Sequence, residues 1–143
     1  MSEPGPIRVL LVDDHAVVRS GLSAFLLAYD DLELVGDAGN GEEALMQIAR
    51  LRPDVVTLDV EMPLMDGIKA TRQILESHPQ CKVLILTTYN EDDLIFDGFR
   101  AGAVGYLLKD VTRRGLADAV RGASRGEAQI DPAIASQVLA EFQ

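Results

Sequence analysis

The stretch Val55-Val56-Thr57-Leu58-Asp59-Val60-Glu61-Met62-Pro63 decides how this chain folds. Its apolar, β-branched run is typical of a parallel strand that is buried on both faces. Pro63 cannot donate to a sheet ladder, so the strand is expected to end near Asp59. In an open α/β sheet, chemistry is found in the loops beyond the carboxyl ends of the strands. Asp59 is therefore predicted to lie at that edge, although an acid at a strand end is also an ordinary strand-to-loop residue.

Four more segments have strand patterns, and helical patterns separate them. The other expected strands are 7–13, 32–35, 83–87 and 104–108, and the expected helices are 15–28, 42–51, 68–75, 91–101, 116–123 and a short one within 132–142. Strands that alternate with helices indicate a parallel sheet with right-handed crossovers and helices on both faces. We therefore predict an α/β fold with a doubly wound five-stranded parallel sheet, strand order 2-1-3-4-5.

Composition limits the classes of function that this chain can have. Its 143 residues suffice for one domain with a single core, and the low aromatic content of 5% predicts an aliphatic core. A formal net charge of -10 argues against direct binding of nucleic acid by this segment, since phosphates require clustered Lys and Arg. The single cysteine, Cys81, excludes an internal disulfide. No stretch is long enough to span a bilayer and none resembles a signal peptide, so a cytoplasmic protein without a membrane partner is expected.

Polar side chains end four of the predicted strands. Asp13 and Asp14 follow the first strand, Asp59 the third, Thr87 the fourth and Lys109 the fifth. In the order 2-1-3-4-5 the first and third strands are neighbours, so the three acids should converge in one crevice. Like charges about 4 Å apart repel by roughly 4 kcal/mol at an effective dielectric near 20. The cluster therefore needs a cation, and Lys109 together with a magnesium ion held by hard oxygen ligands would supply it. Asp14 is also expected to cap the helix at 15–28, since a short acid accepts the free N–H groups of a first turn. In the alternative interpretation, the acids only cap helices and Lys109 is a surface lysine.

The order of the motifs resembles the receiver domain of two-component response regulators over residues 7–125. The matching segments are Leu11–His15, Leu58–Pro63, Met65–Gly67, Leu86–Thr88, Ala101–Ala103 and Gly105–Asp110. The residues of the segments Asp13-Asp14-His15 and Leu107-Leu108-Lys109-Asp110 resemble those of the NarL/FixJ (LuxR-type) subfamily. The resemblance implies the flavodoxin-like, CheY-like (βα)5 fold.

The same resemblance assigns roles to the polar residues. It implies that Asp59 accepts a phosphoryl group from a phosphohistidine on a sensor histidine kinase. Asp14, Asp59 and the backbone carbonyl of Glu61 would bind Mg2+, and Asp13 would act mainly through a bound water. A carboxylate can be a nucleophile of this kind, and phosphoryl transfer depends chiefly on positioning and cationic stabilisation.

Further residues match the switch of that family. Thr87 would donate a hydrogen bond to one phosphoryl oxygen, and Lys109 would pair with another. Tyr106 matches the aromatic residue that turns inward when Thr87 moves, although an ordinary strand tyrosine would show the same pattern. Glu61 and Tyr89 match positions that tune how fast the phosphoryl group is lost.

The expected organisation is a leader at 1–6, a receiver domain at 7–125 and a linker helix at 126–143. Subfamily members carry a C-terminal helix-turn-helix domain, so the chain is expected to be a segment of a transcription regulator or a free-standing receiver. Homodimerisation on phosphorylation is expected through the face of the fourth helix, fifth strand and fifth helix, or through the first and fifth helices. Leu22, Leu26 and Leu116 would be exposed contacts on the latter face, or alternatively core residues.

Two other functions remain open on the sequence. A magnesium-dependent phosphohydrolase of the haloacid-dehalogenase type would have its two acids two positions apart, whereas Asp13 and Asp14 are adjacent. A receiver-like binding module without phosphorylation would not need the complete set of acids, Thr87 and Lys109. We therefore expect a phosphoacceptor domain rather than an enzyme with turnover. His15 and His78 are expected at helix ends, and Asp110 replaces a proline common in receivers, which makes a cis peptide after Lys109 doubtful.

Overall fold

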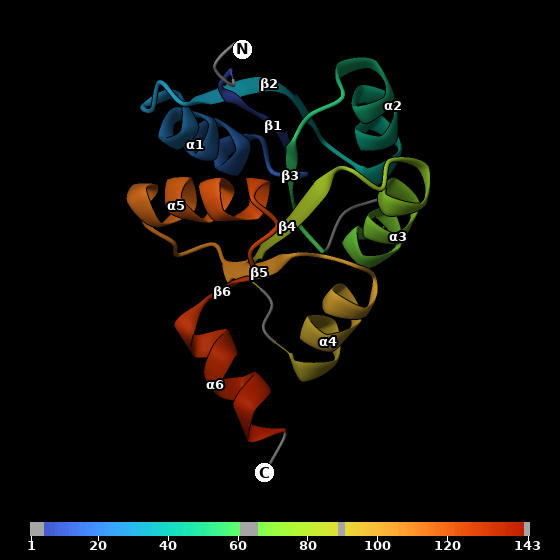
Figure 1. Cartoon of the computed structure of the whole chain (residues 1–143), viewed down its shortest axis with the longest axis vertical. Helices are drawn as coiled ribbons and strands as arrows, with labels where there is room; N and C mark the ends of the chain where they lie inside the picture. The colour runs from blue at the N-terminus through green and yellow to red at the C-terminus, as the bar shows by residue number, and fades with distance from the viewer. Residues whose placement is uncertain (1–4, 61–65, 89–90, 142–143) are drawn as a thin grey trace.

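The computed structural model describes residues 5–60, 66–88 and 91–141, which form a parallel sheet with helices on both faces (Figure 1). The strands are β1 (Ile7–Val12), β2 (Leu32–Ala38), β3 (Val55–Leu58), β4 (Lys82–Thr87), β5 (Gly105–Leu108) and β6 (Gln129–Ile130). The helices are α1 (Ala16–Leu27), α2 (Gly41–Leu51), α3 (Gly67–Ser77), α4 (Asp92–Arg100), α5 (Arg113–Ser124) and α6 (Pro132–Ala140). Alternation of strand and helix, as predicted, gives the doubly wound architecture.

The strand order is β2-β1-β3-β4-β5-β6, and every neighbouring pair is parallel. The predicted order of the first five strands is confirmed, but the predicted number of five strands is wrong. The two-residue β6 joins the edge of the sheet through backbone bonds, among them Gln129 N to Val104 O at 3.0 Å and Asp131 N to Tyr106 O at 3.2 Å. So short a strand has no side-chain periodicity, which is why the sequence pattern did not reveal it.

Gly105 makes the approach of β6 possible. A Cβ at this position would lie 2.4 Å from the Gln129 carbonyl oxygen, closer than any side chain tolerates. The glycine therefore allows the backbone of the C-terminal segment to reach β5, in the way that strand glycines often mark a close approach of another backbone.

The register brings the carboxyl ends of four strands to one edge of the sheet. Val12 is paired with Leu58, and Thr87 is paired with Leu108. The backbone bonds continue one residue further, from Asp59 N to Val12 O at 3.1 Å and from Lys109 N to Thr87 O at 2.8 Å. These bonds hold the ends of β1 and β3 beside each other and the ends of β4 and β5 beside each other, with β3 next to β4 between the two pairs.

Three apolar clusters fill the space between the sheet and the helices. One lies under α1 and α5, a second under α2 and α3, and a third joins α4, β5 and α6. Leu22, Leu26 and Leu116 belong to the first cluster and are buried. The expectation that they are exposed contacts between the first and fifth helices is therefore wrong, and the alternative that they are core residues is confirmed.

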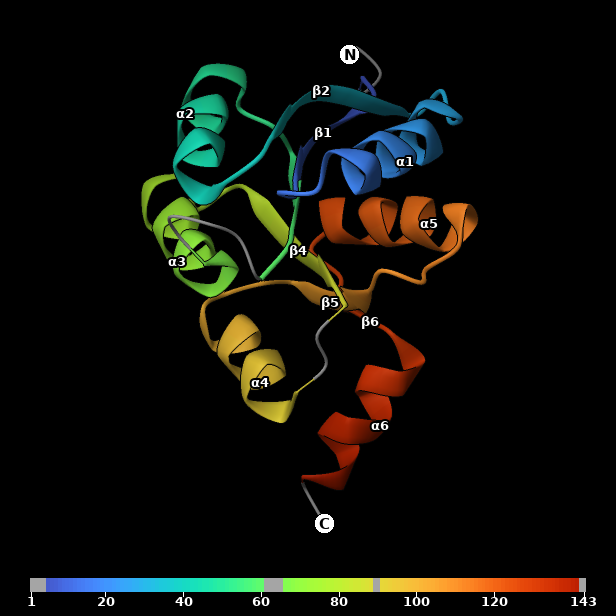
Figure 2. The same ribbon diagram turned by 180° about the vertical axis from the view of Figure 1, so that it is seen from behind.

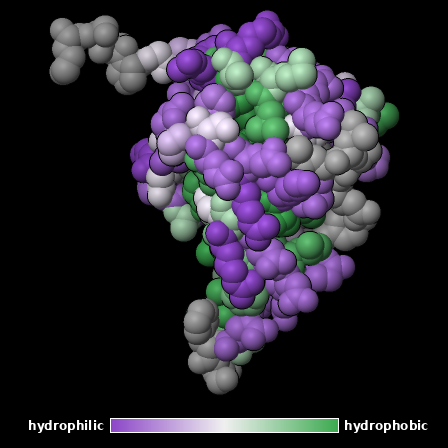
Figure 3. Space-filling model, turned by 90° about the vertical axis from the view of Figure 1, so that its right-hand side faces the viewer, coloured by the Kyte–Doolittle hydropathy of each residue, from purple (hydrophilic) through white to green (hydrophobic). Residues whose placement is uncertain are grey.

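The helix ends follow local chemistry. The side chains of Asn40, Asp66, Thr112 and Asp131 accept backbone N–H groups at the starts of α2, α3, α5 and α6. The N-cap of α1 is His15 rather than a carboxylate, and His78 is the C-cap of α3, so both histidines lie at helix ends as expected. The face over α2, α3 and α4 is largely hydrophilic in Figure 3, as expected for amphipathic helices with a buried stripe.

Candidate functional site

The predicted phosphoacceptor lies at the carboxyl edge of the sheet, directly after β3. Asp59 has a relative exposure of 3%, Asp13 of 1% and Thr87 of 0%. Burial of carboxylates is unfavourable unless hydrogen bonds and opposite charges compensate for it. The contacts of these acids therefore determine what the site can do.

Lys109 joins two of the acids. Its Nζ lies 2.6 Å from Asp13 Oδ2 and 2.8 Å from Asp59 Oδ2, although the sequence separates Lys109 from Asp59 by 50 residues. Burial lowers the pKa of the Lys109 ammonium, but the hydrogen bonds and charges of Asp13 and Asp59 outweigh this effect and raise it above its usual value. The lysine therefore remains a cation beside the acids. All peptide bonds described by the structure are trans, including the one that follows Lys109.

Thr87 provides the second contact to the acceptor. Its Oγ1 donates a hydrogen bond of 2.9 Å to Asp59 Oδ1, so each carboxylate oxygen of Asp59 accepts from a different strand end. Both bonds have lengths typical of strong hydrogen bonds to a carboxylate. The contacts fix the orientation of the Asp59 carboxylate between β4 and β5.

The acids form a set of oxygens that fits a hard cation. Asp13, Asp14, His15 and Asp59 place ligand atoms within 4.8 Å of one another. Asp14 Oδ1 is buried and accepts no hydrogen bond from the described residues, although His15 Nδ1 lies 2.9 Å from it and would form an ion pair if protonated. A buried oxygen of this kind, beside two further carboxylates, meets the preference of Mg2+ for oxygen ligands. The residues therefore fit a magnesium ion.

Asp13 has structural contacts besides Lys109. Its Oδ1 accepts the backbone N–H of His15 at 2.9 Å, which orders the turn between β1 and α1. The sequence had suggested that Asp14 caps this helix; the carboxylate that bonds to the turn is instead Asp13. Asp14 is thereby left to direct its carboxylate toward the acid cluster.

Arg19 is a neighbour of the site that the sequence patterns did not single out. Its Nη1 donates a 2.6 Å hydrogen bond to the backbone carbonyl of Asp13, and its Nε lies 3.8 Å from Asp37 Oδ1. Arg19 follows Asp13 by six residues, on the first turn of a helix that starts beside the acids. That spacing was a usable signal, because a long side chain there reaches back to the strand end.

Gly67 determines how closely α3 approaches the acceptor. A Cβ on this residue would lie 2.1 Å from the Asp59 carbonyl oxygen and 2.5 Å from Val60 Cα. Its N–H donates to the Val60 carbonyl at 2.7 Å. Only glycine allows the start of α3 to contact the backbone of Asp59 directly.

Tyr106 lies in β5 on the same side of the sheet as Thr87. Its side chain is fully buried, and burial raises the pKa of its hydroxyl above the usual range. The Tyr106 and Phe99 rings are tilted, with centroids 6.4 Å apart. Glu61 and Tyr89, which the resemblance also selected, lie outside the described residues.

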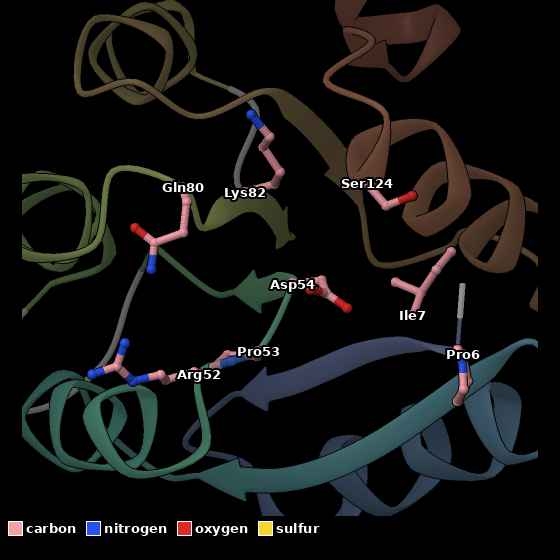
Figure 4. Close-up of a pocket in the computed structure, with 9 residues that line it drawn as sticks. Pro6, Ile7, Arg52, Pro53, Asp54, Gln80, Lys82 and Ser124 are labelled. Atoms are coloured by element: carbon pink, nitrogen blue, oxygen red, sulfur yellow. The ribbon is translucent and has the colours of Figure 1, made fainter. Parts of the chain in front are cut away.

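A hollow of about 390 Å³ lies at the other end of the strands, opposite the carboxyl ends (Figure 4). It is lined by Gly5, Pro6, Ile7, Arg52, Pro53, Asp54, Gln80, Lys82 and Ser124. Except for Ser124 at the end of α5, these residues lie at the amino ends of β1, β3 and β4, so the hollow is separated from Asp59 by the length of the strands. Asp54 is the only acid among its lining residues, whereas the described acid cluster lies at the carboxyl ends of the strands.

A CheY-like sheet that gathers acids, a threonine and a lysine around one buried aspartate is the structure of a receiver domain. Residues 9–121 match the family of the response regulator receiver domain, and the chain belongs to this family. The resemblance read from the motifs is thereby confirmed. No helix within the described residues combines the length and the hydrophobicity that crossing a membrane requires.

The chain is similar to several regulators along nearly its whole length. It is 43% identical over 137 residues to the transcriptional regulatory protein LiaR of Bacillus subtilis, covering 96% of this chain and 65% of LiaR. It is 43% identical over 128 residues to the response regulator VraR of Staphylococcus aureus, covering 90% of this chain and 61% of VraR. A solved response regulator of the LuxR family from Aurantimonas superposes with a TM-score of 0.91 at 30% identity, covering 96% of this chain and 99% of that one. The chain thus spans less than two thirds of the length of these curated relatives.

Proposed function

We propose that this chain receives a phosphoryl group on Asp59 from a phosphohistidine of a sensor histidine kinase. The observation that carries the proposal is the convergence of Asp13, Asp14 and Asp59 with Lys109 and Thr87 at one sheet edge. Structural ion pairs of Lys109 with Asp13 and Asp59 alone would not need a third acid, Asp14, in the same cluster. A site for an acyl phosphate needs both the acids and the cation.

The reaction is a displacement at phosphorus. A carboxylate oxygen of Asp59 forms the new O–P bond while the N–P bond of the phosphohistidine breaks, and its electron pair returns to the imidazole nitrogen. Lys109 and Thr87 contact the two Asp59 oxygens. We infer that they donate hydrogen bonds to the equatorial phosphoryl oxygens during transfer. Such fixed donors stabilise the charge of a loose transition state.

Asp14 and Asp59 are the proposed direct ligands of Mg2+, with the Glu61 carbonyl as a third ligand and Asp13 acting through a bound water. The ion, when bound, neutralises the acids and the charge of the transferring group. Lys109 would keep Asp13 and Asp59 paired before transfer and contact the phosphoryl group after it. Asp13 also orders the loop before α1, which positions Asp14.

The proposed output is a change of conformation through Thr87 and Tyr106 that controls dimerisation. The relatives are longer, and LiaR is described as a transcriptional regulatory protein. We infer that in the cytoplasm this receiver regulates transcription through a DNA-binding domain that belongs to the longer protein, while the acidic receiver itself does not contact DNA. Its chemistry is restricted to its own phosphorylation and dephosphorylation.

Incubation with acetyl phosphate and Mg2+, followed by intact-mass measurement, tests the proposal. We expect one phosphoryl addition that disappears with a magnesium chelator and in Asp59→Asn. Asp54→Asn is the matched control, because Asp54 is exposed at the opposite end of β3, and it should be labelled like the native chain. Equal labelling of Asp59→Asn would show that the acceptor is wrong. Steady turnover of a small phosphate ester would instead favour a phosphohydrolase.

A further inference from the structure

The C-terminal segment of residues 129–140 covers the side of the sheet next to α4. Figures 1 and 2 both show α6 below β6 and beside α4, away from α1 and α2. β6 extends the sheet at β5, with Gly105 opposite Gln129 and Tyr106 opposite Ile130. The segment therefore touches both the strand that carries Tyr106 and the helix that follows β4.

Apolar packing holds α6 in place. Ile134 is 0% exposed and belongs to the same cluster as Tyr106 and Ile95, and Val138 packs against this cluster. The opposite side of the helix is open, since Leu139 is 65% exposed. One turn beyond Ile134, Gln137 Nε2 donates a 2.9 Å hydrogen bond to Asp92 Oδ1 at the start of α4. A helix of nine residues is marginal by itself, so its order depends on these contacts.

The same cluster shares a face of the sheet with Thr87. Ile85 is paired with Tyr106, and Thr87 is paired with Leu108. Because side chains alternate along a strand, Ile85 and Thr87 project to one face of β4, and Tyr106 lies beside them. Thr87, whose hydroxyl donates to Asp59, therefore lies on the same face of the sheet as the cluster that contains Ile85, Tyr106 and Ile134.

Phosphorylation of Asp59 would change its contact with Thr87. Thr87 donates directly to a carboxylate oxygen of Asp59. A phosphoryl group adds charge and acceptor oxygens further from the backbone, so the hydroxyl has to move to reach them. Close-packed interiors do not deform continuously, and a shift of Thr87, Tyr106 or α4 breaks the packing around Ile134.

We propose that residues 129–140 form a latch that is docked on α4 and β5 while Asp59 is unphosphorylated and is released when Asp59 is phosphorylated. This rests on the proposed function of Asp59. The occupant of the α4–β5 face is thus the chain's own segment, and phosphorylation exposes both this face and the segment. Coupling between the two equilibria is reciprocal, so loosening the latch must favour the phosphorylated state of Asp59 over the unphosphorylated state by the same factor.

Hydrogen exchange read by mass spectrometry tests the latch on the full chain. Samples with and without acetyl phosphate and Mg2+ are compared, and the intact mass of each sample reports how much of it is phosphorylated. We expect amides of residues 132–140 to exchange about tenfold faster after phosphorylation, within the usual range of allosteric coupling, while β1 and β3 remain unchanged.

Variants test the reciprocal effect. Ile134→Ala should raise the phosphorylated fraction at limiting acetyl phosphate about five- to tenfold. Gln137→Ala, which removes a contact at the surface instead of one in the core, should also raise the phosphorylated fraction. Leu139→Ala, on the exposed side of the same helix, is the matched control and should behave like the native chain. Unchanged exchange at 132–140 in a fully phosphorylated sample would overturn the latch and leave the proposed function intact. Failure of the native chain to become phosphorylated would overturn both.

Discussion

Replacement of Lys109 by methionine tests the electrostatic balance of the acid cluster. The ammonium group contacts Asp13 and Asp59 at 2.6 and 2.8 Å, and both acids are nearly inaccessible to water. Methionine keeps a chain of comparable length but removes the charge and the donors. The two carboxylates would then face each other without a cation, so Lys109→Met is expected to lower the free energy of unfolding.

The size of the effect follows from the geometry. Ligand oxygens of the cluster lie within 4.8 Å of one another. At that separation two unit charges repel by about 3.5 kcal/mol at an effective dielectric of about 20. Removal of one partner from a buried ion pair costs about 3–5 kcal/mol, so the two approaches agree on a loss of about 3–4 kcal/mol. A domain of ordinary stability, about 5–15 kcal/mol, remains folded after such a loss.

Mg2+ should restore much of the lost stability, because it replaces the missing positive charge. A ligand at about 100 times its Kd stabilises a folded chain by about 2.7 kcal/mol. Lys109 repels a cation bound beside it, so the variant should bind Mg2+ more tightly than the native chain. The gain in stability with Mg2+ is therefore expected to be larger for Lys109→Met.

Urea unfolding followed by circular dichroism, with and without Mg2+, measures both effects. Lys82→Met is the matched control, because Lys82 is half-buried at the amino end of β4, far from the acids. An unfolding midpoint of Lys109→Met equal to that of the control would refute the ion-pair reasoning. A Mg2+ effect no larger than in the native chain would refute the assignment of the cluster as a cation site.

Three further substitutions test the packing of two helix glycines and the burial of a thiol. Gly67→Ala should destabilise the chain by about 2 kcal/mol or more and reduce phosphorylation, since its Cβ would lie 2.1 Å from the Asp59 carbonyl; Gly21→Ala, with open space around it, should stabilise α1 by about 1 kcal/mol. Burial raises the pKa of the Cys81 thiol from 9.0 to about 11. Between these values the unfolded chain loses the proton that the folded chain keeps, so the free energy of unfolding should fall by up to about 2.7 kcal/mol as pH rises. Cys81→Ala should lack this part of the pH dependence in urea titrations at pH 9 and pH 11, and an identical slope in both proteins would contradict it.

The order of elements and the place of the acceptor could be predicted from the chain's pattern. Buried parallel strands are continuous apolar runs, and Asp59 directly follows the apolar run that forms β3. Once the strand order is fixed, carboxyl ends share one edge, so residues that follow β1, β3, β4 and β5 must meet. The convergence of Asp13, Asp59, Thr87 and Lys109 is therefore confirmed, while their proposed roles await experiment.

The sequence pattern predicted side-chain burial and helix caps less well than it predicted the order of the elements. Leu22, Leu26 and Leu116 have a helical spacing that suits either a core stripe or an exposed apolar face, and only packing against the sheet decides for the core. The cap of α1 was misjudged for a similar reason. Two adjacent acids can each reach the turn before α1, and it is the carboxylate of Asp13 that accepts the backbone N–H of His15.

Local periodicity along the chain determines which segments are strands and helices, and with them the edge at which the acids gather. Tertiary structure alone decides that Lys109 bridges Asp13 and Asp59, that a buried Asp14 oxygen lies beside these acids, and that β6 and α6 close over β5 and α4. These contacts join residues far apart in the chain through backbone pairing and close packing. Neither backbone pairing nor close packing of this kind gives a periodic pattern in the sequence. Backbone hydrogen bonds form between the same groups whatever the residue type, and a single buried side chain such as Ile134 is not part of a repeating pattern.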